Sequence, residues 1–356
     1  MPSTRSAQGL RLERMRASPQ FSGDGRFVNT YASTAPRVPR EGSKLSTLAE
    51  IAFGGAGRRP AQALPSLDPR AGWSGAAETG LRVTWLGHST MLLEIDGCRV
   101  LTDPVWGQRA SPFSFAGPRR FQPVPVGLAA LPPLDAVLVS HDHYDHLDRA
   151  TVQALNGLGV RFVTSLGVGR HLEAWGIPAE RITELDWWEQ ATLPGGLVIT
   201  AAPSHHFSGR GPFDRNATLW SSFALRGERH AVYFSGDTGL SPAFGEIGRR
   251  LGPFDLAAIE VGAFHPSWAD VHLGPDNALQ AWSELGSGRL LPVHWGTFDL
   301  ALHDWHEPAE VLFAKAGDGL VMPRIGEPIE PARVDGVAPW WRALAGGARA
   351  PERRFA

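Results

Sequence analysis

The stretch SHDHYDH, residues 140–146, decides the fold and directly follows the apolar run Asp135–Ser140. Four potential metal ligands lie within it: His141, His143, Asp145 and His146. The apolar run predicts a strand, and a strand end fixes the start of a loop whose side chains can then surround a small volume. Imidazole and carboxylate without thiolate suit zinc, iron or manganese. The stretch therefore predicts a metal site.

Four ligands so close in sequence can hardly all reach one ion, so remote ligands and a second metal are expected. Three segments offer candidates, and each follows a predicted strand. These segments are Pro203-Ser204-His205-His206, Ser235-Gly236-Asp237-Thr238-Gly239 and His294-Trp295-Gly296. Catalytic groups that gather at strand ends on one rim are typical of a layered α/β enzyme.

Apolar runs and turn residues predict the order of elements along the chain. The predicted strands are Leu81–Leu86, Met91–Ile95, Arg99–Thr102, Asp135–Ser140, Arg161–Ser165, Leu197–Ala202, Ser221–Leu225, His230–Ser235, Leu256–Val261 and Arg289–His294. The predicted helices are Arg149–Leu155, Val168–Trp175, Pro242–Leu251, Pro275–Leu285 and Pro308–Ala316. Two runs of strands with helices between them predict an α/β fold in which helices cover two sheets, a four-layer αβ/βα sandwich.

Composition excludes several classes of protein. The 356 residues are 43% apolar and 20% charged, which is enough to build a core and excludes a wholly disordered chain. A net charge of -2 argues against a nucleic-acid binder. The single cysteine, Cys98, excludes an intramolecular disulfide and a multi-cysteine metal site. No apolar stretch is long enough to span a bilayer, and the N-terminus lacks the apolar segment of a secretory signal. We therefore expect a cytoplasmic protein that has peripheral contact with the inner face of the membrane.

Three regions are expected along the chain: an irregular basic N-terminal arm (1–78), a catalytic domain (79–330) and a C-terminal tail (331–356). Residues 1–60 contain ten Arg or Lys and four Asp or Glu, a net charge of about +6. The arm is predicted to be loop apart from a helix around Ser46–Ala52. It would wrap the domain, dock a partner subunit, touch an anionic surface, or remain a solvated extension.

Together, the HxHxDH run, the later His, the Gly-Asp-Thr-Gly and the terminal His resemble the metallo-β-lactamase superfamily of dinuclear hydrolases. Further stretches resemble its N-acylphosphatidylethanolamine-hydrolysing phospholipase D family. They are TWLGHST (84–90), LTDP (101–104), GPRRF (117–121), ELDWWE (184–189), GPFDLAAI (252–259), HWGTF (294–298) and, in the arm, GRFVN (25–29). The resemblance covers roughly residues 24–315 and implies the metallo-β-lactamase fold.

By this resemblance, His141, His143 and His206 would hold the first metal. Asp145, His146 and His294 would hold the second, and Asp237 would bridge the two. His206 is preferred to His205 because the family's ligand lies three residues after a proline, here Pro203. His272 matches a histidine that does not bind metal but lies near the substrate, and we take it with Asp145 as catalytic. His88 and Asp103 would orient ligands without binding metal.

The resemblance implies hydrolysis of a phosphodiester. N-acylphosphatidylethanolamine or a related glycerophospholipid would give phosphatidic acid and an N-acylethanolamine. Two Zn²⁺ ions, with Mn²⁺ or Fe²⁺ as alternatives, lower the pKa of a water to about 7, so that a metal-bridging hydroxide attacks at neutral pH. Two divalent ions and two aspartates leave a charge of about +2, which favours anionic substrates. Asp145 would orient the hydroxide or take its proton.

Three alternative functions are considered, and the first of them stays open. A lactone or cyclic-phosphate hydrolase of the same fold would act on a small soluble substrate as well as on lipid. A non-catalytic, metal-stabilised binding protein is disfavoured because every expected ligand is present. A β-lactamase proper is disfavoured because nothing outside the metal site resembles one.

The expected partners are an anionic phospholipid or another phosphodiester, a membrane surface and, by resemblance, a second copy in a homodimer; nucleic acid is not expected. The chain contains 13 Trp against 3 Tyr. Most of these rings are expected to pack in the core. Those in loops would form an apolar acyl cleft and interfacial surface: Trp106, Trp187, Trp188, Trp220 and Trp268.

Overall fold

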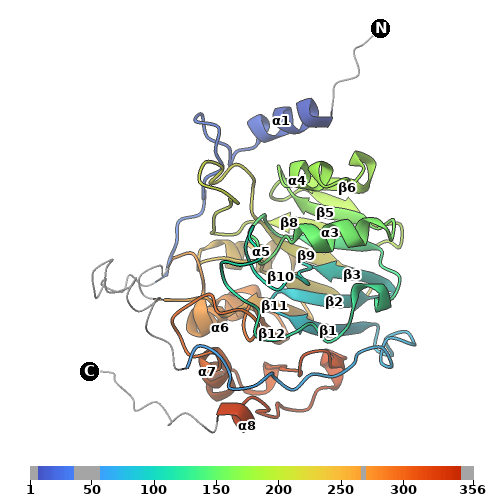
Figure 1. Cartoon of the computed structure of the whole chain (residues 1–356), viewed down its shortest axis with the longest axis vertical. Coiled ribbons are helices and arrows are strands. Elements are labelled where there is room, and N and C mark those ends of the chain that lie inside the picture. The colour runs from blue at the N-terminus through green and yellow to red at the C-terminus, as the bar shows by residue number, and fades with distance from the viewer. Residues whose placement is uncertain (1–6, 36–56, 266–269, 346–356) are drawn as a thin grey trace.

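The computed structural model describes residues 7–35, 57–265 and 270–345, which form two sheets covered by helices (Figure 1). The helix predicted around Ser46–Ala52 and the side chain of Trp268 lie outside these residues. The first sheet has seven strands in the order β13-β1-β2-β3-β4-β5-β6, and the second has six in the order β12-β11-β10-β9-β8-β7. In the described part of the chain, no helix is both long and apolar enough to span a membrane.

The strands of the first sheet are β1 (Leu81–Gly87), β2 (Thr90–Ile95), β3 (Cys98–Thr102), β4 (Ala136–Val139), β5 (Arg161–Ser165), β6 (Ile182–Leu185) and β13 (Pro328–Ile329). Those of the second are β7 (Gln190–Thr192), β8 (Val198–Ala202), β9 (Ser222–Arg226), β10 (Ala231–Phe234), β11 (Leu256–Glu260) and β12 (Arg289–Val293). The helices are α1 (Ala7–Ala17), α3 (Arg149–Asn156), α4 (Gly169–Ala174), α5 (Ala243–Leu251), α6 (Gly274–Leu285), α7 (Glu307–Lys315) and α8 (Arg342–Ala345).

Two cores separate the four layers. Alternate residues of a strand point to opposite faces of its sheet. In β4, Val137 and Val139 therefore pack with α3 and α4 in one core, while Leu138 joins the core between the sheets. That second core continues through the second sheet to Ile247 of α5 and Ala278 of α6. The four-layer αβ/βα sandwich predicted from the sequence is confirmed.

The topology brings the ends of the strands that precede the site to one edge. In the first sheet, β3, β4 and β5 run parallel. In the second, β10, β11 and β12 run parallel, and β8 shares their direction because β9 is antiparallel to both β8 and β10. The loops that leave the carboxyl ends of β4, β8, β10 and β12 carry the predicted ligands, as expected for α/β enzymes.

The N-terminal arm contains a helix, α1, where the sequence predicts loop. α1 lies at one end of the molecule, beyond α4 and β6 (Figure 1). Arg11 pairs with Glu173 at 2.8 Å and with Glu184 at 2.6 Å, and Arg14 pairs with Glu189. The helix was missed because its apolar residues are few and its docking depends on these ion pairs. Of the roles considered for the arm, the described part wraps the domain.

The described end of the tail packs on the domain as well. The ring of Trp341 is fully buried, and its Nε1 donates a hydrogen bond to Glu310 of α7 at 2.7 Å. The same ring makes an edge contact with Trp295, which directly follows His294. Residues 331–345 thus form part of the support behind the site.

Candidate metal centre

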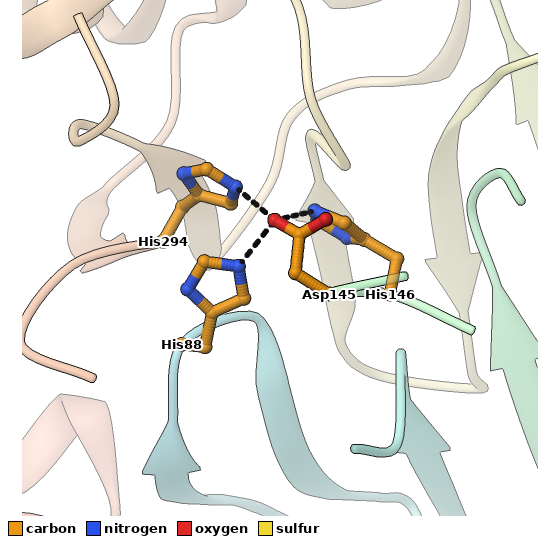
Figure 2. A group of neighbouring side chains, drawn as sticks. All are labelled: His88, Asp145, His146 and His294. Carbon is orange, nitrogen blue, oxygen red and sulfur yellow. Dashed lines mark hydrogen bonds and ion pairs between the residues drawn. The ribbon is translucent and has the colours of Figure 1, made fainter. Parts of the chain in front are cut away.

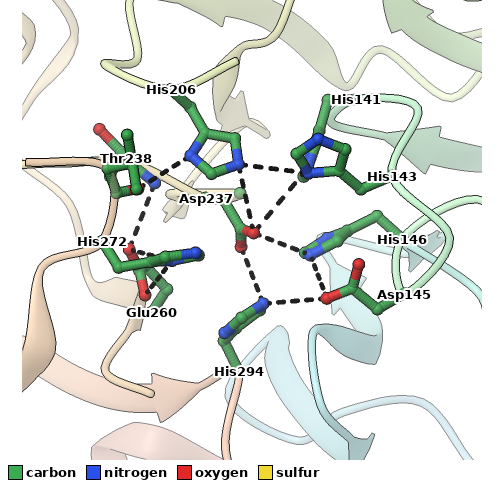
Figure 3. A network of polar contacts seen from close by, with 12 residues as sticks. His141, His143, Asp145, His146, His206, Asp237, Thr238, Glu260, His272 and His294 are labelled. Atoms are coloured by element: carbon green, nitrogen blue, oxygen red, sulfur yellow. Dashed lines mark hydrogen bonds and ion pairs between the residues drawn. The ribbon is translucent and has the colours of Figure 1, made fainter. Parts of the chain in front are cut away.

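A network of buried imidazoles and carboxylates fills the space at this edge of the two sheets (Figure 3). It contains all seven predicted metal ligands: His141, His143, Asp145, His146, His206, Asp237 and His294. The loop after β4 supplies the first four, and the loops after β8, β10 and β12 supply one each. Residues up to 153 positions apart in the chain are therefore brought together by the sheet topology.

One donor group consists of His141, His143, His206 and Asp237, whose ligand atoms all lie within 4.8 Å of one another. His141 Nε2 lies 2.8 Å from His143 Nδ1, and His206 Nε2 lies 3.3 Å from the same nitrogen. Three imidazole nitrogens that converge in this way present their lone pairs to a common point. Such a point suits a cation.

A second donor group consists of His88, Asp145, His146 and His294 (Figure 2). Oδ2 of Asp145 lies 2.9 Å from His88 Nε2, 3.3 Å from His294 Nε2 and 3.4 Å from His146 Nε2. This group has one imidazole more than the predicted second set. His88 therefore lies within reach of an ion as well as of the carboxylate that it was expected to orient.

Asp237 lies between the two groups and faces both. Its Oδ2 is 3.1 Å from His146 Nε2, 3.6 Å from His206 Nε2 and 3.8 Å from His141 Nε2, while Oδ1 is 3.2 Å from His294 Nε2. A carboxylate in this position contacts imidazoles of both groups, as a bridging ligand must.

Gly236 permits this position of Asp237. It has a φ of +53°, and a Cβ there would lie 2.7 Å from the Cβ of Ser140. The two ligand-bearing loops therefore touch at a point where no side chain fits. Three residues of the site, His88, Asp103 and His294, also have positive φ angles of 53°, 34° and 64°. Backbone strain of this kind clusters at functional sites.

Buried carboxylates hold the imidazoles from behind. Asp103 Oδ2 lies 2.7 Å from His146 Nδ1 and accepts a hydrogen bond from Ser140 Oγ at 2.6 Å, so Nε2 of His146 faces Asp237. Glu260 lies 3.3 Å from His272 Nδ1 and accepts from the backbone of Leu273 at 2.9 Å. Partners of this type fix the tautomer and the orientation of a ligand histidine.

The N-terminal arm also reaches the site. Asn29 Nδ2 donates to the carbonyl of His206 at 2.9 Å, and the His206 backbone N–H donates to Asn29 Oδ1 at 3.1 Å. Trp220 Nε1 donates to the same Oδ1 at 3.0 Å. His205 Nδ1 instead lies 2.8 Å from the carbonyl of Tyr31. The arm thus clamps the loop so that His206 faces the group and His205 faces the arm.

The charges of the group shift the pKa of each member. Burial lowers the pKa of His294, but Asp237 and Asp145 outweigh this effect and raise it to about 10. Burial likewise lowers the pKa of His146, and the same two carboxylates hold it well above the usual range. Burial raises the pKa of Asp237, and His146 with His294 brings it well below the usual range. The carboxylates therefore create a field that favours positive charge here.

The donor set fits a pair of divalent cations. Nε2 of His146 and Oδ1 of Asp237 are buried and have only ion-pair contacts in the described structure, without a well-aligned hydrogen bond, and they face the space between the groups. Unpaired buried polar atoms are costly unless a ligand satisfies them. Imidazole nitrogens and carboxylate oxygens are the ligands that Zn²⁺, Mn²⁺ and Fe²⁺ prefer.

Two buried carboxylates near the site were missed. Asp142 accepts from Gly209 N at 2.7 Å and Thr218 Oγ1 at 2.9 Å, which ties the loop after β4 to the loop after β8. Glu260 ends the apolar strand β11. A charged residue at the end of an apolar run is a sequence signal that could have identified Glu260. Asp142 was hidden among the stronger ligands that surround it.

The prediction that Trp side chains form an acyl cleft and interfacial surface is wrong for two of the rings. Trp187 and Trp220 are buried, and Nε1 of Trp187 donates to the carbonyl of Trp220 at 2.8 Å. Trp106 is half-buried against the core under α3, and its Nε1 donates to the carbonyl of Val126 at 2.8 Å. Trp187 and Trp220 pack the interior because each finds an acceptor there for its N–H. These two rings are not available to line an interfacial surface.

Comparison with known proteins agrees with the fold. The family model described as the beta-lactamase superfamily domain matches residues 98–295, more than half of the chain. The solved isothiocyanate hydrolase from Delia radicum gut bacteria superimposes with a TM-score of 0.57 at 20% identity, over 70% of this chain and 98% of that one. This likeness shows the fold alone. The chain belongs to the metallo-β-lactamase superfamily and is a metal-dependent hydrolase.

Relatives within the superfamily are more similar in sequence. An uncharacterized protein of Mycobacterium tuberculosis is 47% identical over 332 residues, covering 91% of this chain and 88% of that protein. The N-acyl-phosphatidylethanolamine-hydrolyzing phospholipase D 1 of Caenorhabditis elegans is 41% identical over 248 residues, covering 66% of this chain and 70% of that enzyme. The resemblance inferred from the motifs is confirmed.

Proposed function

We propose that the chain hydrolyses the phosphodiester bond of a glycerophospholipid, with N-acylphosphatidylethanolamine as first choice. The products would be phosphatidic acid and an N-acylethanolamine. The observation that carries the proposal is the pair of donor groups that share Asp237, in a chain 41% identical to an N-acyl-phosphatidylethanolamine-hydrolyzing phospholipase D. A phosphodiester suits such a centre, since negative charge develops on phosphoryl oxygens during displacement.

In this proposal, His141, His143 and His206 hold one cation and Asp145, His146 and His294 hold the other, with Asp237 shared. Zn²⁺ is the preferred metal, and Mn²⁺ or Fe²⁺ are the alternatives. Two such ions supply Lewis acidity and a hydroxide nucleophile at neutral pH. Asp103 supports the second set through His146, and Asn29 supports the first through the His206 backbone.

Asp145 and His272 would serve the reaction directly. Asp145 is a half-buried carboxylate whose Oδ2 faces three imidazoles, so its other oxygen can accept the proton of the attacking water. His272 stacks on His294 with ring centroids 5.3 Å apart. With Nδ1 held by Glu260, its Nε2 points into the group, where the doubly protonated ring can donate to a phosphoryl or leaving-group oxygen (Figure 3).

A narrow cavity of about 20 Å³ lies beside the group. His294 lies at one wall, and the apolar lining includes Phe121, Trp295, Phe298, Ala301 and Trp305. A space of about this size holds a water molecule and not an acyl chain. A cytoplasmic enzyme in peripheral contact with the membrane, and a homodimer, remain part of the proposal.

Product analysis by mass spectrometry tests the proposal. The purified protein, with its metal content measured, is mixed with N-acylphosphatidylethanolamine vesicles, and an Asp237→Ala variant serves as the control. We expect phosphatidic acid and N-acylethanolamine from the wild type and neither from the variant. If the metal-loaded protein does not hydrolyse the lipid, the assignment of a glycerophospholipid substrate is overturned. Hydrolysis of lactones or cyclic phosphates instead would support the alternative hydrolase.

A further inference from the structure

Three of the four most exposed large apolar side chains in the described part of the chain lie on two loops. Phe113 and Phe115, which are 55% and 78% exposed, project from residues 107–120. Phe213, which is 86% exposed, projects from residues 207–216. We call these three side chains the aromatic rim. Scattered apolar side chains are ordinary on a surface, but a group of phenylalanines marks an interaction site.

Both loops are braced, so the rings are displayed by a fixed backbone. Arg109 donates to the carbonyls of Ser114 at 3.0 Å and Gly117 at 2.7 Å, which closes the first loop beneath the phenylalanines. In the second loop, Asp214 Oδ1 accepts from the backbone N–H of Gly211 at 2.7 Å.

The N-terminal arm holds the second loop from the other side. Arg26 of the arm donates to the carbonyl of Phe213 at 2.7 Å and to that of Arg215 at 3.0 Å. A loop held in this way by distant residues keeps its exposed ring in place. The rim is thus a built feature of the surface.

The two loops are walls of one cavity. This cavity of about 490 Å³ is lined by Arg109 and Pro112 of the first loop and Arg210 of the second. Tyr144, which separates the candidate ligands His143 and Asp145, forms another part of its wall. The loops that carry the aromatic rim therefore flank an opening whose wall includes Tyr144 of the ligand-bearing loop.

The surface around the rim is basic. Residues 107–120 contain three arginines and no acidic residue. Arg119 and Arg149 are exposed, and neither forms an ion pair with an acidic side chain of the described chain. Arg149 also begins α3, where the helix dipole disfavours a cation. Unpaired positive charge beside exposed aromatic rings is complementary to an anionic lipid surface.

Helix α1 is a poorer candidate than the aromatic rim for contact with an anionic lipid surface. Arg11 and Arg14 pair with glutamates of the domain, so the positive charge of α1 is largely neutralised. The described structure therefore favours the rim over α1 for attraction to a membrane.

We propose that the aromatic rim and the neighbouring arginines dock the protein on an anionic lipid bilayer. The three rings enter the headgroup region, and the guanidinium groups of Arg119 and Arg149 contact lipid phosphates. This inference rests on the proposed function, since a glycerophospholipid substrate must be drawn from a bilayer. Docking in this orientation places the opening between the loops against the lipid.

Vesicle sedimentation tests the surface with the full-length, metal-loaded protein. The vesicles contain either phosphatidylcholine alone or phosphatidylcholine with phosphatidylglycerol. We expect binding to the anionic vesicles that weakens as salt rises. The double variant Phe115→Ser, Phe213→Ser should bind vesicles at least about tenfold more weakly, because two rings that become buried in the lipid are lost. Each of Arg119→Gln and Arg149→Gln should weaken binding roughly fivefold on anionic vesicles.

A matched control is Leu158→Ser. Leu158 is 55% exposed but follows the C-terminus of α3, at the other end of the helix from Arg149, and its loss should leave vesicle binding unchanged. The rim variants should keep the wild-type rate on a short-chain soluble phosphodiester. Asp237→Ala should bind vesicles as the wild type does, which separates docking from hydrolysis.

Two results would overturn the proposal that the aromatic rim docks on lipid. In one, the rim variants bind vesicles as tightly as Leu158→Ser. In the other, the wild type ignores vesicles while the rim variants convert a dimer to a monomer in gel filtration, which would make the rim an interface between copies. If vesicle binding follows the expected pattern but no lipid is hydrolysed, the proposed function fails and the docking surface stands.

Discussion

Asn29 offers a test of how the arm supports the metal centre. Its side chain makes three hydrogen bonds, two with the backbone of His206 and one with Nε1 of Trp220, at 2.9 to 3.1 Å. Asn29→Ala removes all three without touching any candidate ligand side chain. The loop after β8 would then lose the contact that directs His206, rather than His205, into the group.

The expected losses of stability and metal affinity follow from these hydrogen bonds. A net hydrogen bond contributes about 0.5–1.5 kcal/mol, so three bonds at a half-buried position predict a loss of roughly 2–3 kcal/mol in the free energy of unfolding. Loss of a group that orients a ligand weakens metal binding by about 10- to 100-fold. Asn29→Asp keeps both acceptor bonds but sets a carboxylate beside the carbonyl of His206, so its loss of affinity should be intermediate.

Chelator competition on the refolded, metal-free protein measures the affinity, and urea unfolding measures stability. Asn156→Ala is the control, because Asn156 Nδ2 also joins two segments through the carbonyl of Gly176 at 3.0 Å but lies at the C-terminus of α3. The control should lose stability and keep metal affinity. If Asn29→Ala binds metal as tightly as Asn156→Ala does, the clamp has no role in the site.

Three further predictions concern the fold and the metal. Gly236→Ala should lose roughly 3 kcal/mol of stability, because its Cβ would lie 2.7 Å from the Cβ of Ser140. Gly286 has a similar φ but open space around it, so the control Gly286→Ala should lose only about 1 kcal/mol. Equal losses of the two variants in urea unfolding would refute the steric clash at Gly236. Burial raises the pKa of Asp96, but hydrogen bonds from Arg229 and His230 outweigh this and lower it. Its contribution is therefore present above the unfolded pKa and lost as pH falls through the folded one. Asp96→Asn should cost about 1 kcal/mol at pH 7, and the difference should shrink as the pH falls below the unfolded pKa of about 4. A difference that stays constant with pH would contradict this. Removing metal with a chelator should lower the Tm by at least about 5 °C, and an unchanged Tm in calorimetry would show that the cluster stabilises the fold without metal.

Most of the fold could be predicted because its strands are buried on both faces. Runs such as Leu256–Glu260 are almost wholly apolar, so they stand out from their turns. β7 (Gln190–Thr192) was missed because this short edge strand is largely exposed and polar. α1 was missed because its position depends on ion pairs with residues over 150 positions away. Local sequence carries no trace of such partners.

The predicted ligands lie together because each directly follows a strand whose direction the topology fixes. The support behind them could be predicted only in part. Asp103 follows a strand and was expected to orient a ligand, and it contacts His146. Asn29 lies 177 positions from His206, in a segment without periodic pattern, so its contact depends on how the arm folds back. The exposed Phe213 also has no signal in the sequence that separates it from core phenylalanines.

Anomalous diffraction from crystals of the zinc-loaded protein would show directly whether the centre is dinuclear. We expect two zinc peaks about 3.5–4 Å apart, with a carboxylate oxygen of Asp237 next to each. One peak should contact His141, His143 and His206, and the other should contact Asp145, His146 and His294. A single peak, or two peaks that do not share Asp237, would contradict the dinuclear centre.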